Sequence, residues 1–231
     1  MYRYETHLHT APASKCARAT VRESLEFYKR AGFDGVFITN HYLDGNLGMD
    51  ESEPFDKRIK FYFDDLNEGR ALAKEIGIKV FAGVELTYGG TDFLIYGIPD
   101  EWYAAHPEIL RMEKTEELPR LMEEGALIIQ AHPFREASYI DHIRLYPRHV
   151  HGVEIINACR KDIENEMARI YCEKYGLLPF AGSDNHVAAK RARLAGLEFP
   201  YPIEDERGFI DAFFKGDGNI FTINRENEVD K

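Results

Sequence analysis

Five of the nine histidines in this chain stand at the C-terminal ends of short apolar runs that are typical of strands. His7 and His9 are separated by one residue, a spacing at which two side chains of a strand point the same way. Imidazole nitrogens combined with carboxylate oxygens suit zinc, iron or manganese. The sequence therefore predicts a centre for divalent metal ions. Its predicted ligands are His7, His9, His41, Glu85, His132, Asp184 and His186.

The same residues indicate the chemistry that such a centre would perform. A carboxylate such as Glu85 can bridge two ions, and no serine or cysteine stands in a recognisable nucleophile elbow. Water activated by metal is therefore the predicted attacking group. Cys159 also follows a strand-like run and is a candidate ligand, because thiolate suits zinc; a small buried thiol is the alternative for this residue.

The elements that must position these residues alternate between strand and helix. The apolar runs are bounded by glycine and polar residues, as strands usually are. Most helical patterns between them end at a glycine, which is common after a last helical turn. The predicted strands are 2–7, 35–40, 79–86, 92–96, 126–131, 152–157, 178–182 and 219–224. The predicted helices are 21–31, 55–76, 115–124, 162–175 and 204–215.

This alternation predicts an α/β fold, because near-continuously apolar strands separated by helices form a parallel sheet covered by helices. The sheet could close into a barrel or remain open. No glycine-rich phosphate loop follows the first strand, which disfavours a nucleotide-binding version. In a barrel the carboxyl ends of the strands meet at one rim, where active sites lie. No linker or repeat divides the chain, so we expect one domain over residues 1–231.

The composition limits the classes of partner. With 44% hydrophobic residues the chain is expected to fold, and its formal net charge of −11 disfavours binding to a membrane surface or to nucleic acid beyond small oligonucleotides. No apolar run is long enough to span a membrane, and the first residues do not resemble a signal peptide. Three cysteines at unrelated spacings fit a reducing compartment, so we expect a cytoplasmic enzyme. Nothing in the sequence indicates an oligomeric state.

The order and spacing of these motifs resemble the PHP (polymerase and histidinol phosphatase) family. The resemblance covers nearly the whole chain, from residue 4 to about residue 196. It implies a distorted (β/α)7 barrel, a site for two or three divalent ions (Zn, Mn or Fe) at the C-terminal rim, and hydrolysis of a small phosphorylated substrate. The motifs that carry the resemblance are His7-x-His9, Asn40-His41, Gly83-x-Glu85, His132-Pro133 and Ser183-Asp184-x-His186.

The resemblance also implies which residues share an ion. By this resemblance, the first metal would be held by His7, His9, Glu85 and Asp184. The second metal would be held by Glu85 and His132. A third would take His41 and His186. Two positions differ from the family pattern. Ser14-Lys15-Cys16 stands where an acidic residue or histidine is common, so Cys16 is a candidate thiolate ligand of a weak third ion. Asp92 is the candidate ligand where a further histidine is usual for the second ion.

A phosphorylated substrate also needs cationic side chains near the rim. Lys15, Arg18, Arg135 and Arg160 all follow predicted strands, and Arg135 is the first choice because guanidinium can bind phosphate through two hydrogen bonds. For catalysis we expect Arg135 to neutralise charge on the phosphoryl oxygens, and Asp184 or a neighbouring histidine to orient the attacking water. Either His41 or a water bound to metal is the candidate that protonates the leaving oxygen.

Two other classes of function remain open from the sequence. Amidohydrolases, which hydrolyse amides or lactones, also begin with His-x-His, but they usually carry a metal-bridging lysine after a middle strand, and none is seen here. A barrel that keeps its metals without catalysis is the other alternative. A largely intact set of ligands argues against it, because structural zinc sites are closed tetrahedra.

Overall fold

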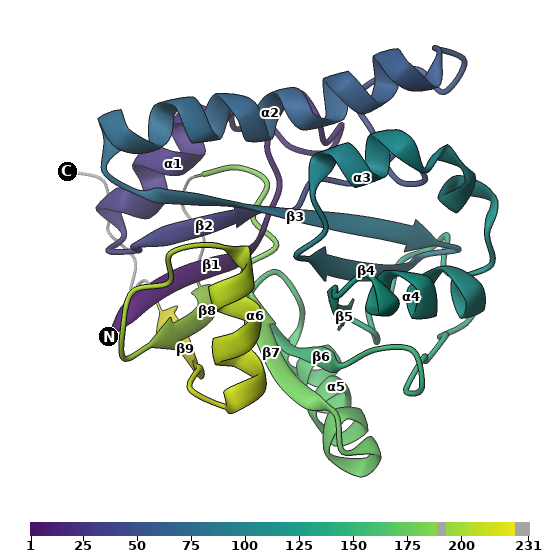
Figure 1. The fold of residues 1–231 in the computed structure, drawn as a ribbon. Coiled ribbons are helices and arrows are strands. Elements are labelled where there is room, and N and C mark those ends of the chain that lie inside the picture. Colours follow the sequence, from purple (N-terminus) through teal and green to yellow (C-terminus); the bar gives the residue numbers. More distant parts are fainter. Residues whose placement is uncertain (189–192, 225–231) are drawn as a thin grey trace.

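One mixed sheet of nine strands organises residues 1–188 and 193–224, the part of the chain that the computed structural model describes (Figure 1). The strands are β1 (Tyr2–Leu8), β2 (Gly35–Ile38), β3 (Lys79–Tyr88), β4 (Thr91–Tyr96), β5 (Leu127–Ala131), β6 (Gly152–Asn157), β7 (Leu178–Gly182), β8 (Arg193–Phe199) and β9 (Asn219–Asn224). The helices are α1 (Val21–Arg30), α2 (Phe55–Ile76), α3 (Asp100–Ala105), α4 (Lys114–Glu123), α5 (Asp162–Tyr175) and α6 (Glu206–Lys215), with a short 3-10 helix, η1 (Pro107–Arg111), after α3.

The strands lie in the order β7-β6-β5-β4-β3-β2-β1-β8-β9. The pairs β1–β2, β2–β3, β5–β6 and β6–β7 are parallel, whereas β4 is antiparallel to both of its neighbours and β8 to both of its own. Beyond β7 the chain returns to β1: the Asp184 amide donates to the His7 carbonyl oxygen at 2.8 Å, and the His9 amide donates to the Asn185 carbonyl oxygen at 3.0 Å. These hydrogen bonds make the sheet nearly closed.

The α/β class is confirmed, but a parallel barrel of seven units is not. Gly89 and Gly90 form a two-residue turn between β3 and β4 with φ of +56° and +83°, and such a turn joins antiparallel strands. Because β4 runs antiparallel, its first residues lie beside the last residues of β3 and β5. Strand β8, which was not predicted, adds to β1 from the other side.

The helix ends follow local chemistry. Thr20 caps α1, its side chain accepting from the Glu23 amide while the Glu23 side chain accepts from the Thr20 amide. Gly77, Gly176 and Gly216 stop α2, α5 and α6 in the left-handed conformation. The observed bounds of these helices agree with the predicted ones to within two residues; α3 and η1 were not predicted. Within the described ranges, no helix combines the length and apolar character needed to cross a membrane.

Aromatic side chains pack in the interior of the sheet, next to the end of the strands where the predicted site residues lie. Helices α1 and α2 cover one side of β1–β3, and α6 lies on the other (Figure 1). Phe209 of α6 is fully buried, with its ring 4.4 Å from that of Phe37 in β2 and 5.8 Å from that of Phe199 in β8. This apolar cluster occupies the interior of the sheet. Polar side chains that could perform chemistry therefore lie at the end of the strands that α6 does not fill.

Candidate metal centre

A β-bulge in β1 brings the side chains of His7 and His9 close together. Between Glu5 and Leu8 the register against β2 shifts by one residue, because β1 carries one residue more than its partner. The rings of His7 and His9 then face each other, with their Nε2 atoms 3.1 Å apart and both side chains fully buried. The predicted pairing of His-x-His at the end of the first strand is therefore what the structure has.

Glu85 lies at the middle of the cluster, in the part of β3 that extends beyond β2. Its carboxylate oxygens are 3.3 Å from Nε2 of His7, 3.3 Å from Nε2 of His9 and 2.7 Å from Nδ1 of His41. The Nε2 atom of His132, just after β5, lies 3.4 Å away. One buried carboxylate thus contacts four imidazoles from three separate segments of the chain.

His132 and Asp184 have an unusual backbone. Their φ angles are +26° and +54°, in the left-handed region that side chains other than glycine rarely adopt. Each residue follows directly or closely on a strand, β5 or β7, and the turn directs its side chain back toward β1. The Asp184 carboxylate lies 3.6 Å from Nε2 of His7 and 3.4 Å from Nε2 of His9. Strain of this kind is typical of functional sites.

Three groups of ligand atoms, each lying within 4.8 Å of one another, follow from this arrangement. We define the first group as His7, His9 and Asp184, the second as His7, Glu85 and His132, and the third as His9, His41 and His186. All seven residues predicted as metal ligands therefore come together at one end of the sheet, where the carboxyl ends of β1, β2, β3, β5 and β7 meet.

The charges in the cluster stabilise one another. Burial lowers the pKa of His7, but the carboxylates of Glu154, Asp184 and Glu85 outweigh it and raise that pKa well above its usual value. Burial raises the pKa of Glu85, and the surrounding histidines, His41 first, lower it further than burial raises it. His186 differs, since burial and the neighbouring His9 lower its pKa to about 3. The lowered pKa of Glu85 thus favours its ionised form, which attracts positive charge.

This donor set fits divalent metal ions. Both oxygens of Glu85 are buried, and neither has a well-directed hydrogen bond from any residue in 1–188 or 193–224. A fully buried carboxylate without such bonds is costly unless a cation compensates it. Imidazole nitrogen and carboxylate oxygen are the ligands of zinc, iron and manganese sites. The residues present therefore fit the ions that the sequence predicts.

The predicted cationic residues do not all reach the centre. Arg135 does: its Nη2 is 2.9 Å from Oδ2 of Asp92 and 3.2 Å from the carbonyl oxygen of Gly90. Nη2 of Arg160 lies 4.0 Å from Oδ2 of Asp184. Asp92 itself is buried at the start of β4, with Oδ2 3.8 Å from Nε2 of His132. The antiparallel direction of β4 is what brings Asp92 to this edge.

Lys15 and Arg18 are exposed on the loop after β1. The Arg18 amide donates to the carbonyl oxygen of His186 at 2.7 Å, so this loop is fastened beside the third group by its backbone. Cys16 on the same loop is also exposed, and its side chain lies next to His41. Cys159, after β6, donates from Sγ to the carbonyl oxygen of Asp184 at 3.0 Å.

Two buried glutamates that contact the centre, Glu5 and Glu154, were not predicted. Oε1 of Glu5 accepts the backbone amides of His7 and Ser183 at 2.9 and 2.8 Å. Oε1 of Glu154, within β6, lies 2.9 Å from Nδ1 of His7. A signal was available for Glu154, which is a charged residue inside an apolar strand, because such a residue is rarely buried without a specific partner. Glu5 lies in a strand that holds several other polar residues, so no such contrast marked it.

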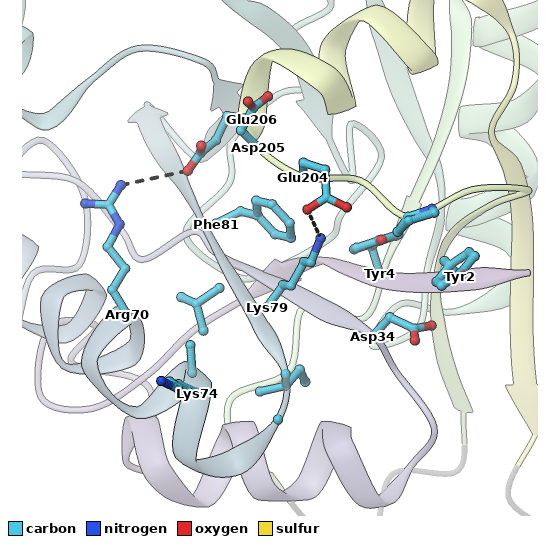
Figure 2. A pocket seen from close by; sticks show the side chains of 15 residues that line it. Tyr2, Tyr4, Asp34, Arg70, Lys74, Lys79, Phe81, Glu204, Asp205 and Glu206 are labelled. Carbon is cyan, nitrogen blue, oxygen red and sulfur yellow. Dashed lines mark hydrogen bonds and ion pairs between the residues drawn. The ribbon is translucent and has the colours of Figure 1, made fainter.

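A sizeable cavity lies away from this centre. It holds about 590 Å³ and is lined by the first residues of β1 and β3, at the end of the sheet opposite the metal ligands (Figure 2). Two pairs of its charged side chains contact across it: Lys79 Nζ is 2.6 Å from Glu204, and Arg70 is 3.8 Å from Glu206. Since these charges are satisfied by one another, we assign no chemistry to this cavity.

The third group is expected to hold its ion weakly. His9 has one nitrogen directed at the cluster, because its Nδ1 is 3.0 Å from Oγ of Ser14. An ion in the first group would use that nitrogen and leave the third with His41 and His186. After exhaustive dialysis we therefore expect two ions per chain, by elemental analysis, in the wild type and in Cys16→Ser.

Other stoichiometries would correct this expectation. Three ions in the wild type and two in Cys16→Ser would make the Cys16 thiolate a ligand of a tightly held third ion. Three ions in both proteins would mean that His9 serves two ions or that a further residue completes the third group.

Comparisons with known proteins show which family and fold this chain is similar to. A family model described as PHP-associated matches residues 162–217, which hold α5, β7, β8 and α6. No curated protein sequence matches the chain. Together with the solved structures described next, the family match supports the resemblance to the PHP family.

Several solved structures share the fold. A two-domain protein from Bacteroides vulgatus, described as containing a predicted PHP-like metal-dependent phosphoesterase, is 14% identical with a TM-score of 0.68, over 95% of this chain and 64% of that one. PsfC from Pseudomonas syringae is 17% identical with a TM-score of 0.64, over 97% and 93%. An amidohydrolase from Chromobacterium violaceum is 14% identical with a TM-score of 0.52, over 81% and 89%. The chain thus spans less than two thirds of the first of these proteins, and at such identities the likeness concerns the fold.

Proposed function

We propose that this PHP-family chain is a metal-dependent hydrolase that cleaves phosphoesters, with two tightly held ions, zinc, manganese or iron, at the rim of a distorted barrel. The observation that carries the proposal is Glu85, a buried carboxylate surrounded by His7, His9, His41 and His132. Glu85 would hold an ion in the second group, and its oxygens also lie 3.3 Å from Nε2 of His7 and of His9, which belong to the first group.

Bound divalent ions would supply an activated water and neutralise charge on the phosphoryl group. The chain's own residues do the rest. Asp184 turns its carboxylate toward the first group and orients the attacking water by accepting a hydrogen bond. His41, whose side chain is 12% exposed while those of His7 and His9 are fully buried, lies nearer to solvent and donates the proton to the leaving oxygen.

Two arginines prepare the rim for an anion. The Nε–H groups of Arg135 and Arg160 are buried and have no hydrogen-bond partner in the described portion of the chain. Buried donors of this kind are expected to be satisfied by something, and a phosphate oxygen is a strong acceptor. Asp92 and the carbonyl oxygen of Gly90 hold one side of the Arg135 guanidinium, and the ring of Tyr139 lies 5.7 Å from it.

Replacing Arg135 by methionine is expected to lower kcat/KM for an aryl phosphate by about 10- to 100-fold, because one or two charge-assisted hydrogen bonds to the substrate are lost. Steady-state kinetics with saturating metal measure the effect. Arg144→Met is the matched control: Arg144 also donates to the β3–β4 turn, at the carbonyl oxygen of Gly89, but contacts no ligand residue. Equal losses in both variants would mean that Arg135 only supports the turn.

A substrate panel tests the proposed reaction. The protein loaded with manganese or zinc is offered a phosphomonoester, a phosphodiester, an amide and a lactone, each with a chromogenic leaving group. We expect turnover of a phosphoester and none of the amide or lactone. Turnover of the amide or lactone alone would instead make the chain an amidohydrolase, and metal binding without any turnover would favour a non-catalytic barrel.

A further inference from the structure

Glu154 contacts ligands of two different ion groups at once. It lies within β6 and is fully buried. Its Oε1 accepts from Nδ1–H of His7 at 2.9 Å. Its Oε2 accepts the backbone amide of His132 at 3.0 Å. His7 belongs to the first and second groups and His132 to the second.

The first of these hydrogen bonds sets the tautomer of His7. When Nδ1 carries the proton and donates to Glu154, Nε2 presents its lone pair to the cluster, where it lies 3.3 Å from Glu85 and 3.6 Å from Asp184. A carboxylate behind a metal-binding imidazole fixes the ring orientation and raises its basicity, and its loss commonly weakens metal binding 10- to 100-fold.

The second hydrogen bond holds a strained backbone. His132 has φ of +26°, a conformation that its surroundings must impose. Its amide hydrogen is fixed by Oε2 of Glu154, so the direction in which the imidazole leaves the chain depends on this carboxylate. Without that acceptor the turn after β5 is free to relax, and Nε2 of His132 would move away from Glu85.

Asn157, at the end of β6, extends the network to a third ligand. Its Nδ2 donates to Oε2 of Glu154 at 2.9 Å and lies 3.3 Å from Oδ2 of Asp184. Gly182 of β7 leaves room for the carboxylate: a Cβ built there would lie 2.9 Å from Oε1 of Glu154 and 2.5 Å from Cβ of His7. The Glu154 carboxylate is thus held by a hydrogen bond from Asn157 and fits into the space left by Gly182.

We propose that Glu154 is a positioning residue that fixes ligands of the first and second groups together, so that both ions depend on one buried carboxylate. The proposal rests on the proposed metal centre. It assigns Glu154 no contact with substrate. Its effect is on where His7 and His132, and through Asn157 also Asp184, place their ligand atoms.

The test is cobalt binding to metal-free protein, followed by the visible absorption of the bound ion and by competition with a chelator. We expect Glu154→Gln to weaken the binding of the first cobalt ion and of the second by about 10- to 100-fold each, and to change the cobalt spectrum. Glu117→Gln is the matched control, because Glu117 is an equally buried glutamate that pairs with Lys114 on α4 and contacts no ligand residue. It should bind cobalt as the wild type does.

Asn157→Ser tests the effect of the hydrogen-bond geometry without a change in charge. It also tests the proposal if Glu154→Gln does not fold. It removes the Nδ2 donor without changing the net charge, and we expect it to weaken both steps by a smaller factor. Wild-type affinities in the folded variants, or weakening of one step only, would overturn the proposal, as would an equal loss in Glu117→Gln. These readouts need no substrate, whereas the proposed function fails if the wild-type protein binds cobalt but cleaves no phosphoester.

Discussion

Replacing Glu85 by glutamine is expected to abolish metal-dependent turnover, with a loss of about 1,000-fold or more, on the order of 4 kcal/mol in the activation barrier. Glutamine keeps the size of the side chain but removes the charge that faces His7, His9 and His41. Hydrolysis of an aryl phosphate at saturating manganese measures the effect, and elemental analysis should show fewer than two ions per chain.

Glu117→Gln again provides the comparison, because it neutralises a buried glutamate away from the centre. It should retain both ions and turnover close to that of the wild type. A Glu85→Gln variant that keeps two ions and most of its activity would show that the central carboxylate does not hold the metals, and the assignment of the site would be wrong.

Removal of the two metal ions is expected to lower the melting temperature by roughly 20 °C. Each ion that binds only the folded chain at about 1,000 times its Kd stabilises it by about 4 kcal/mol, so two ions contribute about 8 kcal/mol, and each kcal/mol shifts the midpoint by about 2–4 °C in a domain of this size. Calorimetry before and after treatment with a chelator measures the shift. Glu85→Gln should show almost none, since it holds the ions poorly.

A large shift in both proteins would mean that the chelator acts on another metal site. No shift in the wild type, with two ions present beforehand, would mean that the ions bind the folded and unfolded chain alike. In that case the centre would contribute to chemistry but not to stability.

The sequence was informative wherever side chains stand at the ends of parallel strands. Runs such as 152–157 are apolar and bounded by turns, so their carboxyl ends could be located and the residues after them placed on one edge. His41, His132 and Asp184 were found in this way, and the structure brings them together around β1 and β3.

Features that depend on strand direction could not be predicted in the same way. The Asp92–Arg135 pair forms because β4 runs antiparallel and presents its first residues at the edge where β5 ends. The Gly89-Gly90 pair is a hairpin signal that was available but was not weighed against the parallel pattern. Strand β8 was missed because its short run is interrupted by glycine and charged residues.

Glu154 was missed for a different reason. Most of the predicted site residues stand at or after the ends of the predicted strands, whereas Glu154 lies in the middle of one and acts through its neighbours. A buried ionisable residue inside an apolar strand is itself a signal, because it is costly unless a specific partner compensates it. Only the structure shows that its partners are His7 and His132.

The central claim is that ions held by these residues are required for phosphoester hydrolysis. The most direct test is to add manganese or zinc stepwise to metal-free protein and to follow hydrolysis of an aryl phosphate against the number of ions bound per chain. We predict no turnover in the metal-free protein and a rise that levels off at two ions per chain. Turnover that is already complete without metal, or absent when two ions are bound to the folded protein, would contradict the account.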